Sequence, residues 1–178
     1  LLGIFPKHTI YDLAQDRTAH SNMWFAGLTH RLNDHYQING DIRLSKFSDT
    51  VASGGVLATQ GTDLEKEYSV QLTGTSLIKE GDLAIISTTY SDLTTSDITT
   101  LLINARYPIN SKLRINPKFR VRHRNNDIDG STQNTYTPSL QLTYRLRRDF
   151  QIEAELSGDW ERTELAGQTL TDRNYFFL

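Results

Sequence analysis

Cysteine is absent from the sequence, which excludes disulfide bridges and metal centres held by cysteine thiolates. Any run of about 18 apolar residues is also absent, so a transmembrane helix is excluded. Neither sign of charge dominates: the formal net charge of the 178 residues is −2, and we expect no nucleic-acid partner. Only four prolines and 11 glycines stand among many Thr, Ser, Asn and Asp residues, which indicates an ordered all-β chain with polar loops.

Hydrophobic residues are scarce, at 37% of the chain, and the mean hydropathy is −0.48. This value argues only against helical membrane proteins, because a membrane β-barrel needs apolar residues on just one face of each strand. No signal peptide is present, and residues 1–6 look like the interior of a protein sequence. We therefore expect a mature or truncated piece that forms a single domain over residues 1–178, with a longer parent chain left open.

The strongest pattern is a strict two-residue periodicity, clearest over residues 113–124. One side of this segment carries Leu113, Ile115, Pro117, Phe119, Val121 and His123. The other side carries Arg114, Asn116, Lys118, Arg120, Arg122 and Arg124. A helix would spread these residues around its circumference, so the pattern predicts a strand.

Similar alternation recurs along the chain and predicts about ten strands, most of them about 9–12 residues long. The predicted strands are 36–45, 68–77, 101–107, 113–124, 136–145 and 150–160, with weaker ones at 22–32 and 83–90 and stubs at 9–14 and 174–178. Soluble strands typically run to about 5–6 residues, whereas tilted membrane strands need about 9–11. Strand length therefore favours a membrane protein.

The predicted connections alternate between short and long. Tight turns are expected at 33–34, 79–82, 108–112 and 147–149, and longer polar loops at 47–66, 125–134 and 161–171. The connection at 91–97 is shorter than this rule requires. Outer-membrane barrels alternate in this way, with short periplasmic turns and longer outer loops.

Alternation alone does not say which face points inward. A soluble barrel or sandwich buries its apolar face, whereas a membrane barrel turns that face toward lipid. Besides strand length, two features favour lipid. Small residues lie in mid-strand on the apolar face, where a packed core would need larger ones, and aromatic residues lie near strand ends, where membrane-interface girdles are expected. The small residues are Gly40, Gly74, Ala105, Ala154 and Gly158. The predicted interface aromatics are Trp24, Tyr36, Tyr68, Tyr107, Tyr144 and Trp160, with Tyr136 and Phe150 beside them.

Four segments carry a resemblance: YQINGDIRLSKF, LRINPKFRVRHR, YTPSLQLTYRLRRDFQIEAELSGDWERT and TDRNYFF. They look like the later strands of proteobacterial outer-membrane barrels, a group that includes porin-like proteins and the barrels of exopolysaccharide exporters. The resemblance lies in the order of strand, short turn, strand and polar loop, and it resolves no single family. It implies a location in the bacterial outer membrane, contact with lipid and lipopolysaccharide, and a periplasmic or extracellular protein as a possible partner. Such barrels commonly end in an aromatic residue, whereas Leu178 follows Phe176 and Phe177 here, which indicates that a few residues are missing.

The charged residues of the polar faces form the candidate functional site. The predicted lumen-lining and selectivity residues are Arg106, Arg114, Lys118, Arg120, Arg122 and Arg145, with Arg124 beside them, and the carboxylates Glu153, Glu155 and Asp159 two strands further on. If these faces line a lumen, basic and acidic walls would set a transverse field that favours polar solutes. Alternatively the two sets pair with each other and plug a closed lumen, as side chains fill most small barrels.

No cofactor and no metal site is expected. The histidines His8, His20, His30, His35 and His123 show no defensible ligand spacing, and residues 127–130 lack the twelve-residue pattern of a calcium loop. A rim enzyme could be assembled from Asp92, Asp97, His20 and Ser48, but no local motif supports that choice, and we expect no enzyme. Residues 53–55 are expected to be a flexible loop, since no helix follows them.

The sequence thus predicts an all-β, antiparallel, up-and-down transmembrane β-barrel of about ten strands, complete or part of a larger barrel. The leading function is a pore that passes polar solutes or a secreted polymer through a charged lumen. A closed structural or adhesive barrel, a soluble barrel or sandwich that binds a ligand, and a rim-active enzyme remain as alternatives.

Overall fold

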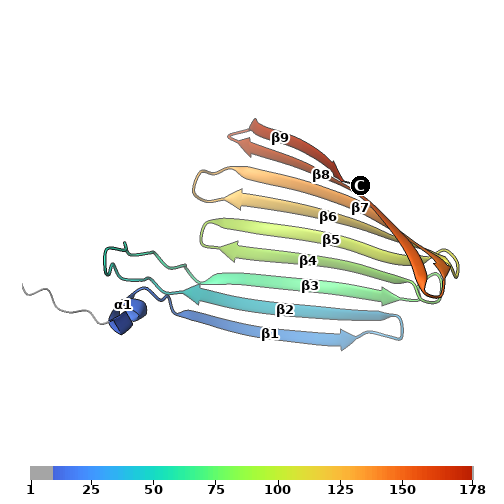
Figure 1. Cartoon of the computed structure of the whole chain (residues 1–178), viewed down its shortest axis with the longest axis horizontal. Helices are drawn as coiled ribbons and strands as arrows, with labels where there is room; N and C mark the ends of the chain where they lie inside the picture. The colour runs from blue at the N-terminus through green and yellow to red at the C-terminus, as the bar shows by residue number, and fades with distance from the viewer. Residues whose placement is uncertain (1–9, 178) are drawn as a thin grey trace, which may run out of the picture.

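The computed structural model describes residues 10–177, most of which belong to one antiparallel β-sheet (Figure 1). Nine strands cross the sheet in chain order, and each pairs with the next. Their bounds are β1 Ser21–Arg31, β2 Tyr36–Phe47, β3 Glu65–Thr75, β4 Leu83–Leu93, β5 Ser96–Pro108, β6 Leu113–Asn126, β7 Thr132–Arg147, β8 Phe150–Leu165 and β9 Gln168–Phe177. The predicted all-β, antiparallel, up-and-down architecture is confirmed at this level.

Over residues 10–177 the sheet is open and does not close on itself, whereas the sequence predicts a barrel that is complete or part of a larger one. In the nine-strand order β1 pairs only with β2 and β9 only with β8, so the two outer strands lie at opposite margins (Figure 1). The strand count is nine instead of about ten, because the segment expected as the first strand is helical. Both margins leave a row of backbone donors and acceptors available to further strands.

Helix α1, Ile10–Asp16, replaces the strand stub predicted at 9–14, of which residue 9 lies outside the described part of the chain. The next residue, Arg17, anchors the helix to the long connection between β2 and β3. Its guanidinium donates to the backbone oxygens of Ser53 and Gly54 at 2.9–3.2 Å, and the Ser53 hydroxyl donates to Asp16 at 2.9 Å. These contacts hold a short helix that would not persist alone.

The predicted alternation of short and long connections holds only in part: connections lie where turns were expected at 33–34, 79–82, 108–112 and 147–149 and where a loop was expected at 47–66, but the loops expected at 125–134 and 161–171 are short. Two-residue turns join β4 to β5, β7 to β8 and β8 to β9, whereas residues 48–64 make the one long connection among residues 10–177. The loop expected at 161–171 is instead the end of β8, a tight turn and the start of β9. Ala166 and Gly167 both have positive φ, as a two-residue hairpin turn requires.

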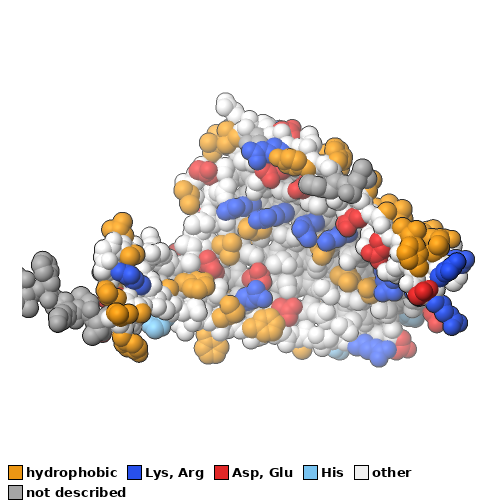
Figure 2. All heavy atoms as spheres, in the orientation of Figure 1, with side chains coloured by type: hydrophobic (Ala, Val, Ile, Leu, Met, Phe, Trp, Pro, Cys, Tyr) orange, Lys and Arg blue, Asp and Glu red, His pale blue; other side chains and the backbone are white. Residues whose placement is uncertain are grey.

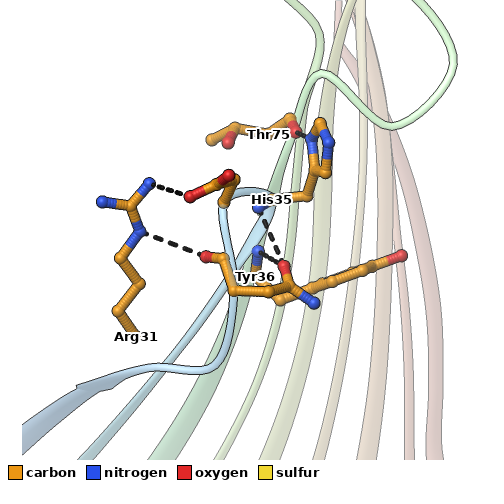
Figure 3. A network of polar contacts seen from close by, with 6 residues as sticks. Arg31, His35, Tyr36 and Thr75 are labelled. Carbon is orange, nitrogen blue, oxygen red and sulfur yellow. Dashed lines mark hydrogen bonds and ion pairs between the residues drawn. The ribbon is translucent and has the colours of Figure 1, made fainter.

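The strands all run between two ends of the sheet, named here by what lies there. The loop end, at the left in Figure 1, holds α1, residues 48–64 and the connection between β6 and β7. The turn end, at the right, holds the connections from β1 to β2, β3 to β4, β5 to β6 and β7 to β8. At the first of these the Asn33 side-chain oxygen accepts from the amides of His35 and Tyr36, and the His35 ring contacts the Thr75 carbonyl at 2.9 Å (Figure 3).

Cross-strand pairing sorts the side chains into two faces, called here the apolar face and the polar face. On the apolar face Ile42 pairs with Tyr68, Leu72 with Ile86, Ile103 with Phe119, and Leu140 with Leu156. On the polar face Asn39 pairs with Gln71, Lys118 with Ser139, and Gln141 with Glu155. The register also resolves β4, whose faces the sequence leaves ambiguous: Ile86 lies on the apolar face and Ile85 on the polar face.

Side chains of the polar face are more buried than those of the apolar face, which is the reverse of a sheet in a soluble protein. On β7, Thr143 of the polar face is 5% exposed, whereas Leu142 and Tyr144 of the apolar face are each 40% exposed. On β4 and β5, Ser87 and Leu102 of the polar face are half-buried, whereas Tyr90 and Ile103 of the apolar face are exposed. Side chains on the inner side of a curved sheet converge and shield one another, so the polar face is the concave one.

A conventional hydrophobic core is missing from residues 10–177, because no hydrophobic side chain in this range is buried. Large apolar side chains such as Trp24, Leu28 and Phe176 are instead well exposed. An exposed apolar surface of this extent marks a site of contact with lipid or protein.

Candidate functional site

The candidate site is the charged part of the polar face over β5 to β8. Strand β6 carries the cationic ladder, and cross-strand pairs place its members opposite β5 and β7: Arg114 opposite Thr143, Lys118 opposite Asn104 and Ser139, Arg120 opposite Leu102 and Thr137, Arg122 opposite Thr100 and Thr135, and Arg124 opposite Ile98 and Gln133. Figure 2 shows Lys and Arg side chains gathered over the middle of the sheet. The predicted cationic residues therefore share one face.

The predicted carboxylates lie on the same face two strands away. Glu153 and Glu155 on β8 pair with Thr143 and Gln141 of β7, so β7 separates the acidic strand from the cationic one. Two strand spacings amount to about 9.5 Å. The two charged sets are thus side by side on one wall and do not face each other across a gap.

Strand β7 lies between the two charged strands and carries neutral hydrogen-bonding side chains on this face. Thr137 donates to Asp159 at 2.8 Å, and Gln141 accepts from Asn116 at 2.8 Å and donates weakly to Glu153 at 3.5 Å. Arg114 reaches Thr143 at 3.5 Å. Asp159 and Glu153 of β8 are therefore held by neutral donors.

None of these charged residues forms an ion pair with another described residue. The ion pairs found in residues 10–177 join Arg31 to Asp34, Arg43 to Glu67, Lys66 to Asp92 and Arg162 to Glu164. The mutual pairing that would plug a closed lumen is absent from this part of the chain. Among residues 10–177 the ladder is therefore uncompensated by ion pairs, although the charge of Arg124 helps the hydrogen bonds from Ser131 to lower the pKa of Asp129.

Two hollows lie along this part of the polar face. One, of about 330 Å³, lies between Asn104, Lys118 and Glu155 in the middle of the sheet. The other, of about 270 Å³, lies at the turn end and is lined by Arg106, Arg114 and Arg145 among others. Arg106 lines both hollows and links them into one polar track.

The predicted interface aromatics fall into two bands on the apolar face. Near the loop end lie Trp24, Tyr68 and Trp160, and near the turn end lie Tyr36, Tyr107 and Tyr144. Tyr136, directly opposite Trp160, belongs to the loop-end band, and the sequence did not identify Tyr90, which pairs with Tyr68. From Tyr136 to Tyr144 the bands are eight residues apart on β7, about 27 Å along the strand.

The bands also show specific packing at one margin of the sheet. Trp160 meets Phe176 of β9 edge to face, with ring centroids 5.4 Å apart. A side chain at Gly158 would collide with the Trp160 ring, so this mid-strand glycine makes room for the indole. The apolar face is not uniformly apolar, because the Lys66–Asp92 ion pair lies on it near the loop end.

Asp82 organises the connection from β3 to β4 at the turn end. Its carboxylate accepts from the amides of Leu77, Ile78 and Lys79 at 2.8, 2.8 and 2.9 Å. These backbone hydrogen bonds, the one from Lys79 first, hold the pKa of Asp82 below its usual value. In the loop from β6 to β7, hydrogen bonds from Ser131 likewise lower the pKa of Asp129.

Asp82→Asn is expected to destabilise the folded chain at neutral pH. It should also remove the part of the loss of stability at acid pH that comes from protonation of Asp82. Because the folded pKa of Asp82 is lowered, its contribution is fully present above the ordinary carboxyl pKa of about 4 and is lost as the pH falls through the folded value. The difference in melting temperature between wild type and Asp82→Asn, measured by circular dichroism in detergent, should therefore shrink from pH 6 to pH 3. Glu80→Gln, in the same connection but outside these hydrogen bonds, is the control. A wild-type advantage that grows toward pH 3 would contradict this assignment.

The remaining candidates have structural partners of their own. The Ser48 hydroxyl accepts from the His20 amide, Asp92 pairs with Lys66, and the Tyr90 hydroxyl donates to Asp97. His123 contacts Asn134 at 2.7 Å, whereas His8 lies outside the described residues. No group of His, Asp and Glu placed to hold a metal ion occurs within residues 10–177.

No protein-family model matches this sequence, and no curated protein matches it. Within residues 10–177, no helix has the length and apolar character needed to cross a lipid bilayer.

Proposed function

We propose that the chain forms part of the wall of an outer-membrane β-barrel that passes polar solutes or a secreted polymer. The observation that carries this proposal is the reversed exposure of the two faces. A concave polar face and a convex apolar face are the arrangement of a membrane barrel, in which lipid covers the outside and water fills the inside. In a soluble barrel or sandwich the apolar face is the enclosed one and the polar face points outward.

The two aromatic bands support the same orientation. Tyr and Trp side chains favour the boundary between lipid tails and headgroups, because one part of the ring is apolar and another is polar. A spacing of about 27 Å along a strand tilted by about 40° spans about 20 Å of membrane, close to the apolar band of about 25 Å in such barrels. Lipid and lipopolysaccharide would then contact the apolar face.

The uncompensated cationic ladder supports passage rather than a filled lumen. Transport would need no covalent step, because size and charge of the solute would decide its passage. Arg120 and Arg122, level with the loop-end aromatic band, would attract anionic groups there, and Glu155 and Asp159 would repel them on the strand beyond β7. Further strands at the two open margins, from the same polypeptide or from other copies, would complete the barrel.

Tryptophan fluorescence tests this orientation directly, because Trp24 and Trp160 are the two tryptophans of the chain and both lie on the apolar face. In vesicles of brominated phosphatidylcholine we expect strong quenching by lipids brominated near the headgroup and weaker quenching by lipids brominated at the tail end. The same sample should migrate faster on a denaturing gel when it is not boiled. The variants Trp24→Phe and Trp160→Phe separate the two signals.

The alternatives give different results in the same experiment. A soluble sandwich would stay in the aqueous fraction with no quenching and no heat shift, which would overturn the membrane proposal. A closed structural barrel would show quenching and a heat shift but no conductance in planar bilayers, which would overturn the transport proposal alone.

A further inference from the structure

The hollow at the turn end gathers cationic side chains from three neighbouring strands. Arg106 comes from β5, Arg114 from β6 and Arg145 from β7, and Lys112 from the connection between β5 and β6 also lines the hollow. Among the lining residues, Glu80 supplies the one carboxylate. Four cationic groups and one anionic group therefore share this space.

The register sets the arginines on a diagonal. Pro108 of β5 and Thr143 of β7 lie opposite Arg114; Arg106 lies two residues before Pro108, and Arg145 lies two residues after Thr143. Diagonal neighbours of this kind are about 7–8 Å apart at their backbones, within reach of long side chains. Arg106 and Arg145 thus flank Arg114 from opposite sides.

This arrangement is costly for the protein alone. None of the three arginines pairs with a carboxylate among residues 10–177, and the Nε of Arg114 is buried with no hydrogen-bond partner there. Like charges at this spacing repel one another, and a buried unpartnered donor has lost water without replacing it. An anion in the hollow would offset both the repulsion between the arginines and the lost hydrogen bond of the buried donor.

The chemistry of the lining defines what would bind. Guanidinium groups present planar pairs of N–H donors that match the oxygens of phosphate or carboxylate, and Thr143 and Gln151 add neutral donors. The volume of about 270 Å³ is slightly below the range of small-molecule sites, which span about 300–1,000 Å³. It accommodates one small charged group and not a large ligand.

We propose that Arg106, Arg114 and Arg145 form a binding site for an oxyanion, phosphate or carboxylate, carried by a small soluble molecule. The site lies on the polar face, so its existence is independent of whether the apolar face meets lipid. It goes beyond solute passage because it requires saturable binding at one place.

The test is calorimetric titration of inorganic phosphate into the full chain folded in a zwitterionic detergent at fixed ionic strength. We expect saturable binding with one phosphate per chain, weakened about tenfold or more by Arg114→Gln and by Arg145→Gln. Arg114→Lys keeps the charge but loses the paired donors, so its affinity should fall between that of wild type and Arg114→Gln. Circular dichroism and the heat shift establish that each variant is folded, and Arg145→Gln, at an exposed position, covers the case in which Arg114→Gln does not fold.

Arg148→Gln is the matched control, because it removes one arginine at the same end of the sheet but outside the hollow and outside the cationic ladder. Its phosphate affinity should equal that of wild type. Absence of saturable binding, or equal weakening by Arg148→Gln, would overturn the proposal. So would binding to phosphatidylglycerol vesicles without binding to inorganic phosphate, since the site would then serve a lipid headgroup. These outcomes leave the fluorescence test of membrane orientation untouched.

Discussion

Leu140→Lys is expected to abolish stable insertion of the chain into lipid vesicles. Leu140 lies on the apolar face of β7, midway between Tyr136 and Tyr144 and opposite Leu156. A lysine facing lipid at the middle of a bilayer costs about 2–4 kcal/mol in a membrane barrel. Since folded proteins are stable by about 5–15 kcal/mol, a loss of this size should appear as a large drop in the fraction that folds into phosphatidylcholine vesicles, measured by the heat shift across a urea series.

Ser139→Lys is the matched control, because it places the same side chain one residue away on the other face. Ser139 lines the central hollow together with Glu155, whose carboxylate a new lysine could approach. This variant should fold into vesicles about as well as wild type. Equal loss in both variants, or greater loss in Ser139→Lys, would mean that the polar face does not border water and would contradict the proposed orientation.

Reversal of charge at Arg120 and Arg122 is expected to turn the ion preference of the pore from anions toward cations. The double variant Arg120→Glu/Arg122→Glu places two carboxylates on β6, two strands away from the existing acidic strand β8 on the same face. With no ion pairs holding the wild-type arginines, the local potential should change sign, and the anion-to-cation permeability ratio should fall about tenfold. The reversal potential in a potassium chloride gradient across a planar bilayer measures this ratio.

Arg147→Glu/Arg148→Glu makes the same change in net charge at the turn between β7 and β8, beyond the ladder. Its effect on the reversal potential should be small. An equal shift in both double variants would mean that total charge, and not the ladder, sets the preference. Wild-type protein that shows the heat shift but passes no current would contradict the pore itself.

The strands that the sequence predicted best are those whose two faces differ most. Residues 113–124, 136–145 and 150–160 all lie within observed strands, since alternation of apolar and polar residues is a direct record of the two faces. Residues 161–171 failed because Arg162 and Glu164 put charged residues on the side of β8 that is apolar up to Trp160, and the turn uses Ala166–Gly167 instead of a stronger turn signal. The helix at Ile10–Asp16 failed because its stability comes from contact with residues 48–64, which local patterns do not record.

The faces of the candidate site could be predicted, but its hollows could not. Knowing that Arg114 and Arg120 share a face requires only counting in steps of two along one strand. Knowing that Arg106, Arg114 and Arg145 meet requires the register between three strands and the curvature of the sheet. Tyr90 was missed for a related reason, because β4 carries isoleucine on both faces and only pairing with β3 assigns them.

The odd number of strands limits how the sheet can become a cylinder. With each strand reversing the direction of the last, the first and ninth strands run the same way, so joining them directly, or joining copies head to tail in the same orientation, would create a parallel seam. Parallel and antiparallel ladders space their hydrogen bonds differently, and such a seam would be an irregular joint that recurs once per copy. A cylinder that is antiparallel throughout needs an odd number of additional strands per copy, so an even number of strands per copy in the assembled ring would mark a uniform wall.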